Sequence, residues 1–357
     1  MTHGRGWMGG AWQDVGVSPT LAARRERRHE GSMGASRTAS VSGATGFVGR
    51  SVVRALLGRG WSVRALARDP AKARVALPTH DNLDVVQGDV LGPGVAAELM
   101  RGSSAAVNCI GIIRERPGGE TFRRLHVQAT RALCEAAAGG GVSRFVQISA
   151  LGVHEEAATE YQRSKAEGER IVRASGLAWT ILRPGLIHGQ AGELTRQMRA
   201  WVTGRAAPFV FMPYFTRVVP GSSPLRPKFE SARVQPVWVE DVARAVCDSL
   251  ERPEAVGEVY NLTGPETVTW PEMLRFVREH VPDAKPGLRC VGLPAPIAAA
   301  KARALGAVGL GQLLPFDAGM ALMAQEDSVA RPHKARVHLG FEPVPFREAF
   351  AGYAGAM

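Results

Sequence analysis

The sequence has few cysteines, few lysines and no long apolar run, and each shortage narrows the kinds of protein that it can encode. Its four cysteines lie far apart and form no C-x-x-C pair: Cys109, Cys134, Cys247 and Cys290. This spacing indicates neither a disulfide framework nor a zinc site, so we expect no bound metal and a reducing, cytoplasmic compartment. No apolar stretch reaches about 18 residues without a charge, and we therefore expect no transmembrane segment.

Charge is plentiful but dispersed along the chain. The 44 basic residues exceed the 33 acidic ones, which gives a net charge of +11. Because the basic residues form no long run, a nucleic-acid-binding arm is not expected. The positive balance suits an anionic partner, which leaves open a nucleotide cofactor, a membrane surface or an acidic protein assembly. Hydrophobic residues make up 45% of the 357 residues, enough for a sizeable core.

Residues 1–37 show no sustained periodicity and are rich in glycine, arginine and serine. We predict a disordered tail there, or an extension upstream of a true start at Met33. From residue 38 on, short apolar runs alternate with amphipathic helical patterns. The predicted strands are 38–42, 62–66, 83–86, 105–110, 144–148 and 179–182, and the predicted helices are 47–58, 70–76, 94–101, 121–138 and 161–175. This alternation predicts an α/β fold, a Rossmann-type doubly wound parallel sheet.

A glycine triplet joins the first predicted strand to the first predicted helix. Its spacing is G-x-x-G-x-x-G, with glycines at 43, 46 and 49. A strand that turns through glycines into a helix presents backbone N–H groups and the positive end of the helix dipole to a pyrophosphate. Gly43 suits the tight turn, Gly46 the close approach of phosphates, and Gly49 close packing of helix on strand. The residues expected to contact a dinucleotide here are Gly43, Thr45, Gly46, Phe47, Val48 and Gly49.

With this loop, residues 38–190 are predicted to form an NAD(P)-binding Rossmann domain, completed by a strand and a helix within 233–263. Residues 191–232, rich in proline and aromatic residues, are predicted to form an irregular cap or flap. Residues 264–357 are predicted to form a smaller, mainly helical lobe on the substrate side. Within it, residues 292–325 are amphipathic, which fits either core packing or contact with a membrane surface.

Parallel sheets bind ligands at the carboxyl ends of their strands, so the residues after each strand are further candidates. Arg68 follows the second strand where an acid would select NAD(H); its guanidinium favours the 2′-phosphate of NADP(H), although a solvated arginine is the plain alternative. Asp89 follows the third strand and fits either an adenine contact or a cap of the helix at 94. The remaining predicted cofactor contacts are Val90, Asn108, Gly111 and Pro184.

Tyr161 and Lys165 stand four residues apart and therefore share one helix face. A lysine so placed lowers the pKa of the tyrosine and holds the nicotinamide ribose, which makes Tyr161 a candidate general acid/base. Ser149, at the end of the fifth strand, is a candidate for polarising a substrate carbonyl. The register leaves an alternative in which Ala150 occupies that place and no serine is available.

Together these motifs resemble the extended or atypical short-chain dehydrogenases/reductases across about residues 38–350. Finer features are similar to the NAD(P)H-binding accessory subunit of respiratory complex I and its bacterial relatives: the stretches 107–115, 120–127, 257–265 and 339–343. The resemblance implies a protein that holds a nucleotide and supports an assembly without evident turnover. Respiratory or other protein assemblies are therefore expected partners, with a location in the cytoplasm or at the inner face of the membrane.

Whether the chain is an enzyme stays open at this point. The first hypothesis is an NAD(P)H-binding protein with a structural or low-turnover role. The alternative is an active NADP(H)-dependent reductase, dehydrogenase or epimerase that acts on a small carbonyl, sugar or quinone-like substrate, with Tyr161, Lys165 and Ser149 as its catalytic residues. A third is a regulatory dinucleotide sensor that acts through a partner protein.

Overall fold

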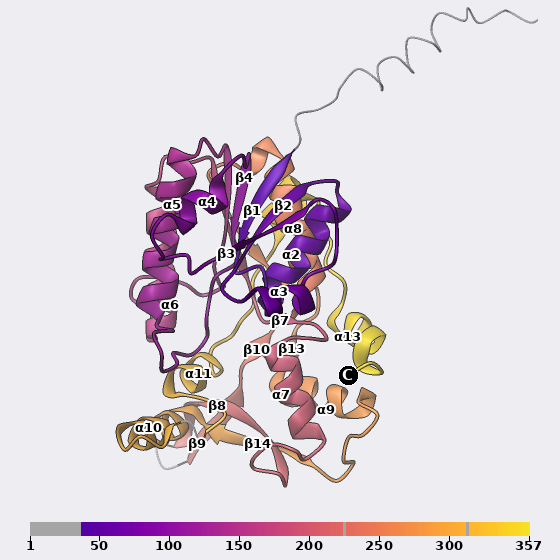
Figure 1. The fold of residues 1–357 in the computed structure, drawn as a ribbon. Coiled ribbons are helices and arrows are strands. Elements are labelled where there is room, and N and C mark those ends of the chain that lie inside the picture. Colours follow the sequence, from indigo (N-terminus) through magenta and orange to yellow (C-terminus); the bar gives the residue numbers. More distant parts are fainter. Residues whose placement is uncertain (1–36, 224–225, 312–313) are drawn as a thin grey trace, which may run out of the picture. The chain divides into compact units, whose positions relative to one another are not determined.

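The computed structural model describes residues 37–223, 226–311 and 314–357. The predicted tail, apart from Arg37, lies outside the described residues. The described chain forms one compact unit from Arg37 to Met357, drawn as a ribbon in Figure 1.

A seven-stranded sheet forms its centre, with the order β12-β6-β5-β4-β1-β2-β3 and every pair parallel. The chain runs outward from β1 in one direction and then restarts at β4 in the other, which opens a crevice at the carboxyl ends of these two strands. The predicted Rossmann sheet is confirmed. Its strands are β1 (Thr38–Ser42), β2 (Ser62–Ala67), β3 (Leu83–Gln87), β4 (Ala105–Asn108), β5 (Arg144–Ile148), β6 (Trp179–Pro184) and β12 (Glu258–Leu262).

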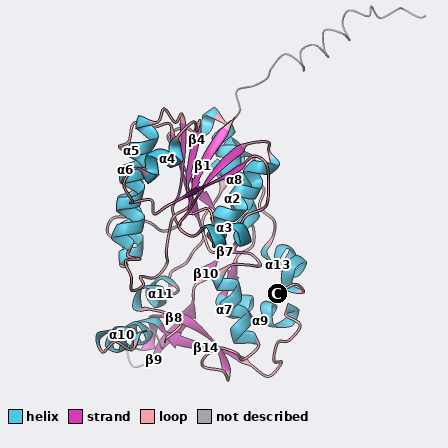
Figure 2. Ribbon diagram, in the orientation of Figure 1, coloured by secondary structure: helices cyan, strands magenta, loops and turns pink. Residues whose placement is uncertain are grey.

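Helices cover both faces of this sheet, as Figure 2 shows. One face packs against α2 (Phe47–Gly58) and α8 (Val239–Glu251), the other against α4 (Val95–Met100), α5 (Ala129–Gly139) and α6 (Glu160–Arg173). Successive side chains of a strand point to opposite faces of the sheet, which explains the two hydrophobic cores. On β5, for example, Phe145 packs in one core and its neighbour Val146 in the other. α3 (Pro70–Ala76) follows β2, and η2 (Pro253–Ala255) follows α8.

The predicted helix 121–138 begins as a wider turn. Residues Arg123–Gln128 (η1) are π-helical and lead directly into α5. Such wide turns are rare and often lie at functional sites. This one places His126 against α6.

The expectation of an irregular segment at 191–232 is wrong. It holds α7 (Glu193–Val202) and a hairpin of β8 (Phe211–Ser223) and β9 (Arg226–Ser231), and β14 (Arg289–Pro294) pairs parallel to β8. Two prolines of β8 are tolerated because Pro213 lies where this strand has a neighbour on the β14 side alone, and Pro220 lies at the register shift of the hairpin. A cap role for this segment stays a prediction.

The C-terminal residues divide between two places. α9 (Trp270–His280), α10 (Ala295–Ala307), α11 (Ala318–Met323) and α13 (Phe346–Ala354) lie on the side of β8 and α7, whereas α12 (His333–Leu339) packs in the core beneath α8 and β12. The C-terminal lobe is therefore mainly helical, with one helix returned to the large sheet. Two-residue strands link the parts: β7 (Ile187–His188) with β11 (Val237–Trp238), and β10 (Arg233–Val234) with β13 (Val268–Thr269).

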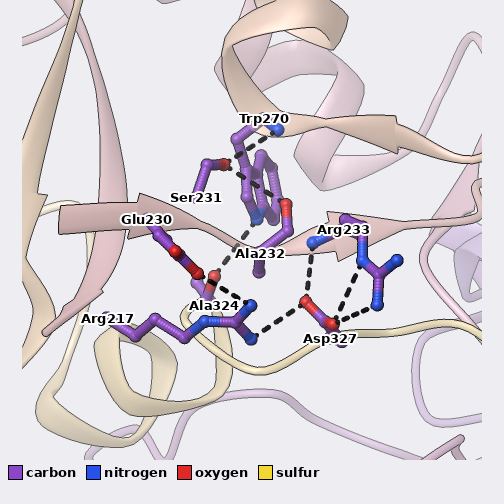
Figure 3. Close-up of polar contacts among 8 residues, drawn as sticks. All are labelled: Arg217, Glu230, Ser231, Ala232, Arg233, Trp270, Ala324 and Asp327. Atoms are coloured by element: carbon purple, nitrogen blue, oxygen red, sulfur yellow. Dashed lines mark hydrogen bonds and ion pairs between the residues drawn. The ribbon is translucent and has the colours of Figure 1, made fainter. Parts of the chain in front are cut away.

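A polar cluster fixes the chain after α11 to the hairpin (Figure 3). Asp327 accepts hydrogen bonds from the backbone N and the guanidinium of Arg233 and from Arg217 at 3.2 Å. Trp270 Nε1 donates to the carbonyl of Ala324 at 3.1 Å. Although burial opposes it, the hydrogen bonds from Arg233 and the charge of Arg217 hold the pKa of Asp327 below its ordinary value.

Among the described residues, no helix has the length and apolarity needed to cross a bilayer.

Candidate functional site

The glycine loop between β1 and α2 has the geometry expected of a phosphate site. Gly43 adopts a positive φ of 69°, and a Cβ there would lie 2.8 Å from the carbonyl of Cys109. A Cβ on Gly49 would lie 2.1 Å from the Gly43 oxygen, so only glycine fits either position. Gly46 is the N-cap residue, and no side chain caps α2. The first N–H groups of the helix are therefore left for an anionic ligand.

The side chain of Asn108 joins the elements at the base of the crevice by hydrogen bonds. Its Oδ1 accepts hydrogen bonds from Ser42 Oγ at 2.8 Å and from the backbone N of Ile110 at 3.0 Å. Its Nδ2 donates to Gln147 Oε1 at 2.9 Å and to Thr130 Oγ1 at 3.2 Å. The side chain thus ties β1, β4, β5 and α5 together at their ligand-facing ends. A direct cofactor contact by Asn108 stays a prediction.

Tyr161 and Lys165 lie together on α6, beside the loop that follows β4. Lys165 Nζ donates to the carbonyl of Ile148 at 3.2 Å, and a Cβ on Gly111 would come within 2.8 Å of Nζ. Burial lowers the pKa of Lys165 to about 8. Burial raises the pKa of Tyr161 to about 12, so the expectation that Lys165 lowers it is wrong. The Tyr161 hydroxyl makes no hydrogen bond to any residue that the structure describes, so this proton donor is free for a ligand.

His126 joins this pair from the π-helical turn. Its Nε2 accepts from the backbone N of Ile112 at 3.1 Å, so Nδ1 carries the proton and donates to Ser164 Oγ at 2.8 Å. Burial lowers the pKa of His126 to about 2, and the ring is neutral at neutral pH. The ring lies 5.4 Å from that of Phe122 and 5.6 Å from that of Tyr161. This contact was not predicted, because a single histidine in a helical pattern has no distinguishing spacing.

Ser149 donates its hydrogen to a buried carboxylate. Its Oγ lies 2.6 Å from Glu169 Oε1, and Glu169 is 1% exposed. Arg183 donates to both carboxylate oxygens, at 2.7 and 2.6 Å, and Arg173 donates to one of them at 2.8 Å. Since Glu169 takes the only hydroxyl hydrogen of Ser149, no donor remains there for a substrate carbonyl. The catalytic role of Ser149 stays a prediction. Glu169 was missed, although it stands four residues after Lys165.

The predicted adenosine side holds two ion pairs. Arg68 extends from the end of β2, 65% exposed at its side chain, and donates to Glu120 Oε1 at 2.9 Å. Asp89 accepts from the backbone N of Leu91 at 3.0 Å and from Arg124 at 3.2 Å. The alternative that Asp89 caps the next helix is wrong, because Gly94 is the N-cap of α4. Adenine contact by Asp89 and phosphate contact by Arg68 stay predictions.

The other predicted contacts lie around the same crevice. Val90 is buried after β3, and Thr45, Phe47 and Val48 are half-buried at the start of α2. Pro184 is buried at the end of β6, where its carbonyl accepts from the backbone N of Leu151 at 2.8 Å. The structure thus gathers the predicted cofactor residues at the carboxyl edge of one sheet. Their contacts with a cofactor stay predictions.

One cavity opens beside Tyr161, and a second adjoins it at Ile113. The first, of about 290 Å³, is lined by Tyr161, Phe122, Arg163, Arg303 and residues of α11. The second, of about 530 Å³, lies among α7, β8, α10 and Trp270. Among the residues that the structure describes, its charged lining residues are Glu193 and Lys301. Ile113 lines both cavities. An apolar chamber therefore adjoins the cleft that Tyr161 lines.

The parallel sheet, the uncapped glycine loop and the tyrosine–lysine pair define a dinucleotide-binding Rossmann protein. A family model described as NAD(P)H-binding matches residues 43–202. The chain belongs to the NAD(P)H-binding, atypical short-chain dehydrogenase/reductase family. The predicted resemblance is confirmed.

Individual relatives carry different names. The chain is 30% identical to the ceramide reductase of Caulobacter vibrioides over 72% of this chain and 74% of that protein. It is 27% identical to the mitochondrial 40 kDa subunit of NADH-ubiquinone oxidoreductase from Neurospora crassa, over 68% of this chain and 60% of that subunit. It therefore spans about three fifths of such subunits. An epimerase structure from Methanothermobacter thermautotrophicus, 18% identical, superposes with a TM-score of 0.65 over 94% of this chain and 97% of that one, a likeness of fold alone.

Proposed function

We propose that this protein is an NAD(P)H-dependent reductase that acts on a carbonyl group within a long, apolar substrate. The observation that carries the proposal is the free hydroxyl of Tyr161 on a cleft that adjoins an apolar chamber of about 530 Å³. A chamber with two charged lining residues suits hydrocarbon better than a sugar nucleotide. The similarity to a protein named ceramide reductase supports the same substrate class.

The residues present fit a bound dinucleotide. The glycine loop offers unpaired N–H groups to its phosphates, and the buried ammonium of Lys165 offers a donor to its ribose. When bound, NAD(P)H supplies the hydride for the carbonyl carbon. Tyr161 supplies the proton to the carbonyl oxygen. A proton from solvent then restores the Tyr161 hydroxyl.

NADP(H) is the favoured cofactor within this proposal. The strand β2 ends without an acid, and Arg68 carries an exposed guanidinium beside the expected adenosine position. To hold a 2′-phosphate, Arg68 must leave or share its contact with Glu120, whose carboxylate would lie close to the same phosphate. The gain from the arginine is therefore partly offset, and the preference for NADP(H) over NAD(H) is modest.

A second candidate is an NAD(P)H-binding accessory subunit with a structural or low-turnover role in a respiratory assembly. The observation that favours it is the use of the Ser149 hydrogen by Glu169, which leaves the usual set of substrate-facing donors incomplete. The mitochondrial relatives are named as subunits of such an assembly. Either role suits the cytoplasm, or the inner face of its membrane.

A chain-length series distinguishes the two. The full chain is mixed with NADPH and, in turn, methyl ketones of increasing alkyl length presented in mixed micelles. The reductase proposal predicts oxidation of NADPH with kcat/KM that rises with alkyl length, because each buried methylene contributes about 0.8 kcal/mol, roughly fourfold. Bound nucleotide without oxidation of any ketone would favour the accessory role.

A further inference from the structure

The helix α10 buries small side chains and exposes a large apolar one, the opposite of what helices in water normally do. Its buried side chains are alanines: Ala295, Ala298, Ala299 and Ala302. Ile297 and Val308, at its start and just after its end, are both 67% exposed. Helices in water normally bury their largest apolar side chains and expose small or polar ones. Here Ile297 and Val308 are exposed, whereas Leu305, the other large apolar residue within α10, is half-buried.

These exposed residues lie along α10 and directly after its end. Ile297 and the exposed Lys301 are four residues apart and share one side of the helix, and Val308 is the residue that follows its last turn. Leu310, two residues beyond Val308, is 46% exposed. We call Ile297, Lys301, Val308 and Leu310 the α10 face. It lies at the end of the described unit away from the seven-stranded sheet (Figure 1).

Cations predominate in the sequence around the α10 face, although Glu193 lines the chamber beside Lys301 and Asp317 lines the first cavity beside Arg303. Residues 284–316 contain four cations, Lys285, Arg289, Lys301 and Arg303, and no aspartate or glutamate. Within the described part of the chain, Lys301 and Arg303 form no ion pair. Their charges are therefore available to an anionic partner. An apolar stripe flanked by unpaired cations is typical of a helix that lies in the headgroup region of an anionic bilayer.

The α10 face is continuous with the apolar chamber. Ile297 and Lys301 line the chamber and are also exposed to solvent. We propose that the α10 face docks on an anionic lipid bilayer, with Ile297, Val308 and Leu310 among the headgroups, so that an apolar substrate enters the chamber directly from the membrane. The route for substrate rests on the proposed reductase function. The docking itself rests on the apolar side chains and the charge.

Vesicle flotation with the full chain tests the docking. The probes are vesicles of phosphatidylcholine alone and of phosphatidylcholine mixed with phosphatidylglycerol. The test variant is Val308→Asp with Leu310→Asp, since neither residue lines either of the two cavities described above. The matched control is Val75→Asp with Val337→Asp, which replaces valines that are 89% and 64% exposed on α3 and α12.

The wild type is expected to float with the anionic vesicles, less so at high salt, and hardly with neutral ones. The test variant is expected to lose tenfold or more in partitioning, roughly what withdrawing two apolar side chains removes, and the control to stay within about twofold. Equal flotation of the two variants, or no binding by the wild type, would overturn the proposal. So would a change from dimer to monomer in the test variant by light scattering, because a second copy would then be the occupant.

Turnover of a short, water-soluble ketone separates this proposal from the proposed function. If docking is lost in the test variant while that turnover is unchanged, both proposals stand. The other outcome is that neither the wild type nor any variant oxidises NADPH, while only the test variant loses vesicle binding. In that case the docking proposal stands and the reductase function fails.

Discussion

Glu169 offers the sharpest test of how the site is held in place. We expect Glu169→Gln to remove the buried charge on which Ser149, Arg183 and Arg173 converge, and to place an amide donor opposite guanidinium donors. Breaking a fully buried ion pair costs about 3–5 kcal/mol. Arg183 and Arg173 are 26% and 41% exposed and regain some hydration, so the lower end, about 3 kcal/mol, applies here.

The assay is urea unfolding of the full chain, followed by tryptophan fluorescence. At an m-value of about 3 kcal/mol/M, a loss of about 3 kcal/mol lowers the midpoint by about 1 M. The control is Arg173→Gln, which removes the most exposed partner and should cost about 1 kcal/mol or less. If Glu169→Gln lowers the midpoint no more than Arg173→Gln does, the carboxylate is not the anchor that its contacts indicate.

Four further outcomes are expected. Gly49→Ala should weaken NADPH binding tenfold or more by titration calorimetry, because its Cβ would meet the Gly43 oxygen at 2.1 Å; unchanged binding would refute this. Arg68→Ser should raise the Kd for NADPH but not for NADH, by about tenfold for one charge-assisted contact. Burial lowers the pKa of Lys165 from 10.5 to about 8, so between these pH values the unfolded chain binds more protons than the folded one. Thermal stability should therefore rise with pH between about 8 and 10.5, and Lys165→Met should abolish that rise. The pKa of Asp327 is lowered in the folded protein, so the stability that its carboxylate contributes is present above the unfolded pKa of 3.8 and is lost as pH falls through the folded pKa. Thermal melts at acid pH should show a smaller loss of stability in Asp327→Asn than in the wild type.

The sheet could be predicted from the sequence because its signals are local. Each strand carries its own apolar run and each helix its own periodicity, so β1 and β5 begin and end where predicted. The loop at Gly43 and the pair Tyr161–Lys165 were also readable, since each depends on residues a few positions apart. The carboxyl-edge rule then gathered them without any knowledge of side-chain contacts.

What was missed depends on contacts between distant segments. β14 pairs with β8 across more than sixty residues, which no local pattern encodes. His126 acquires its role through Ile112 and Ser164, and Ser149 loses its expected one to Glu169. The wrong expectation of an irregular cap arose from counting prolines without knowing that Pro213 falls where β8 pairs on one side alone and Pro220 falls at a register shift.

The most direct test of the reductase account compares Tyr161→Phe with the wild type. NADPH binding is followed by titration calorimetry, and NADPH oxidation with a long-chain methyl ketone is followed by absorbance. The account predicts a Kd for NADPH within about twofold of the wild type, because the hydroxyl is not needed to hold the phosphates, and a loss of kcat of about a hundredfold or more, because the proton donor is gone. Equal turnover by Tyr161→Phe and the wild type, or an absence of turnover in both with NADPH bound, would contradict it.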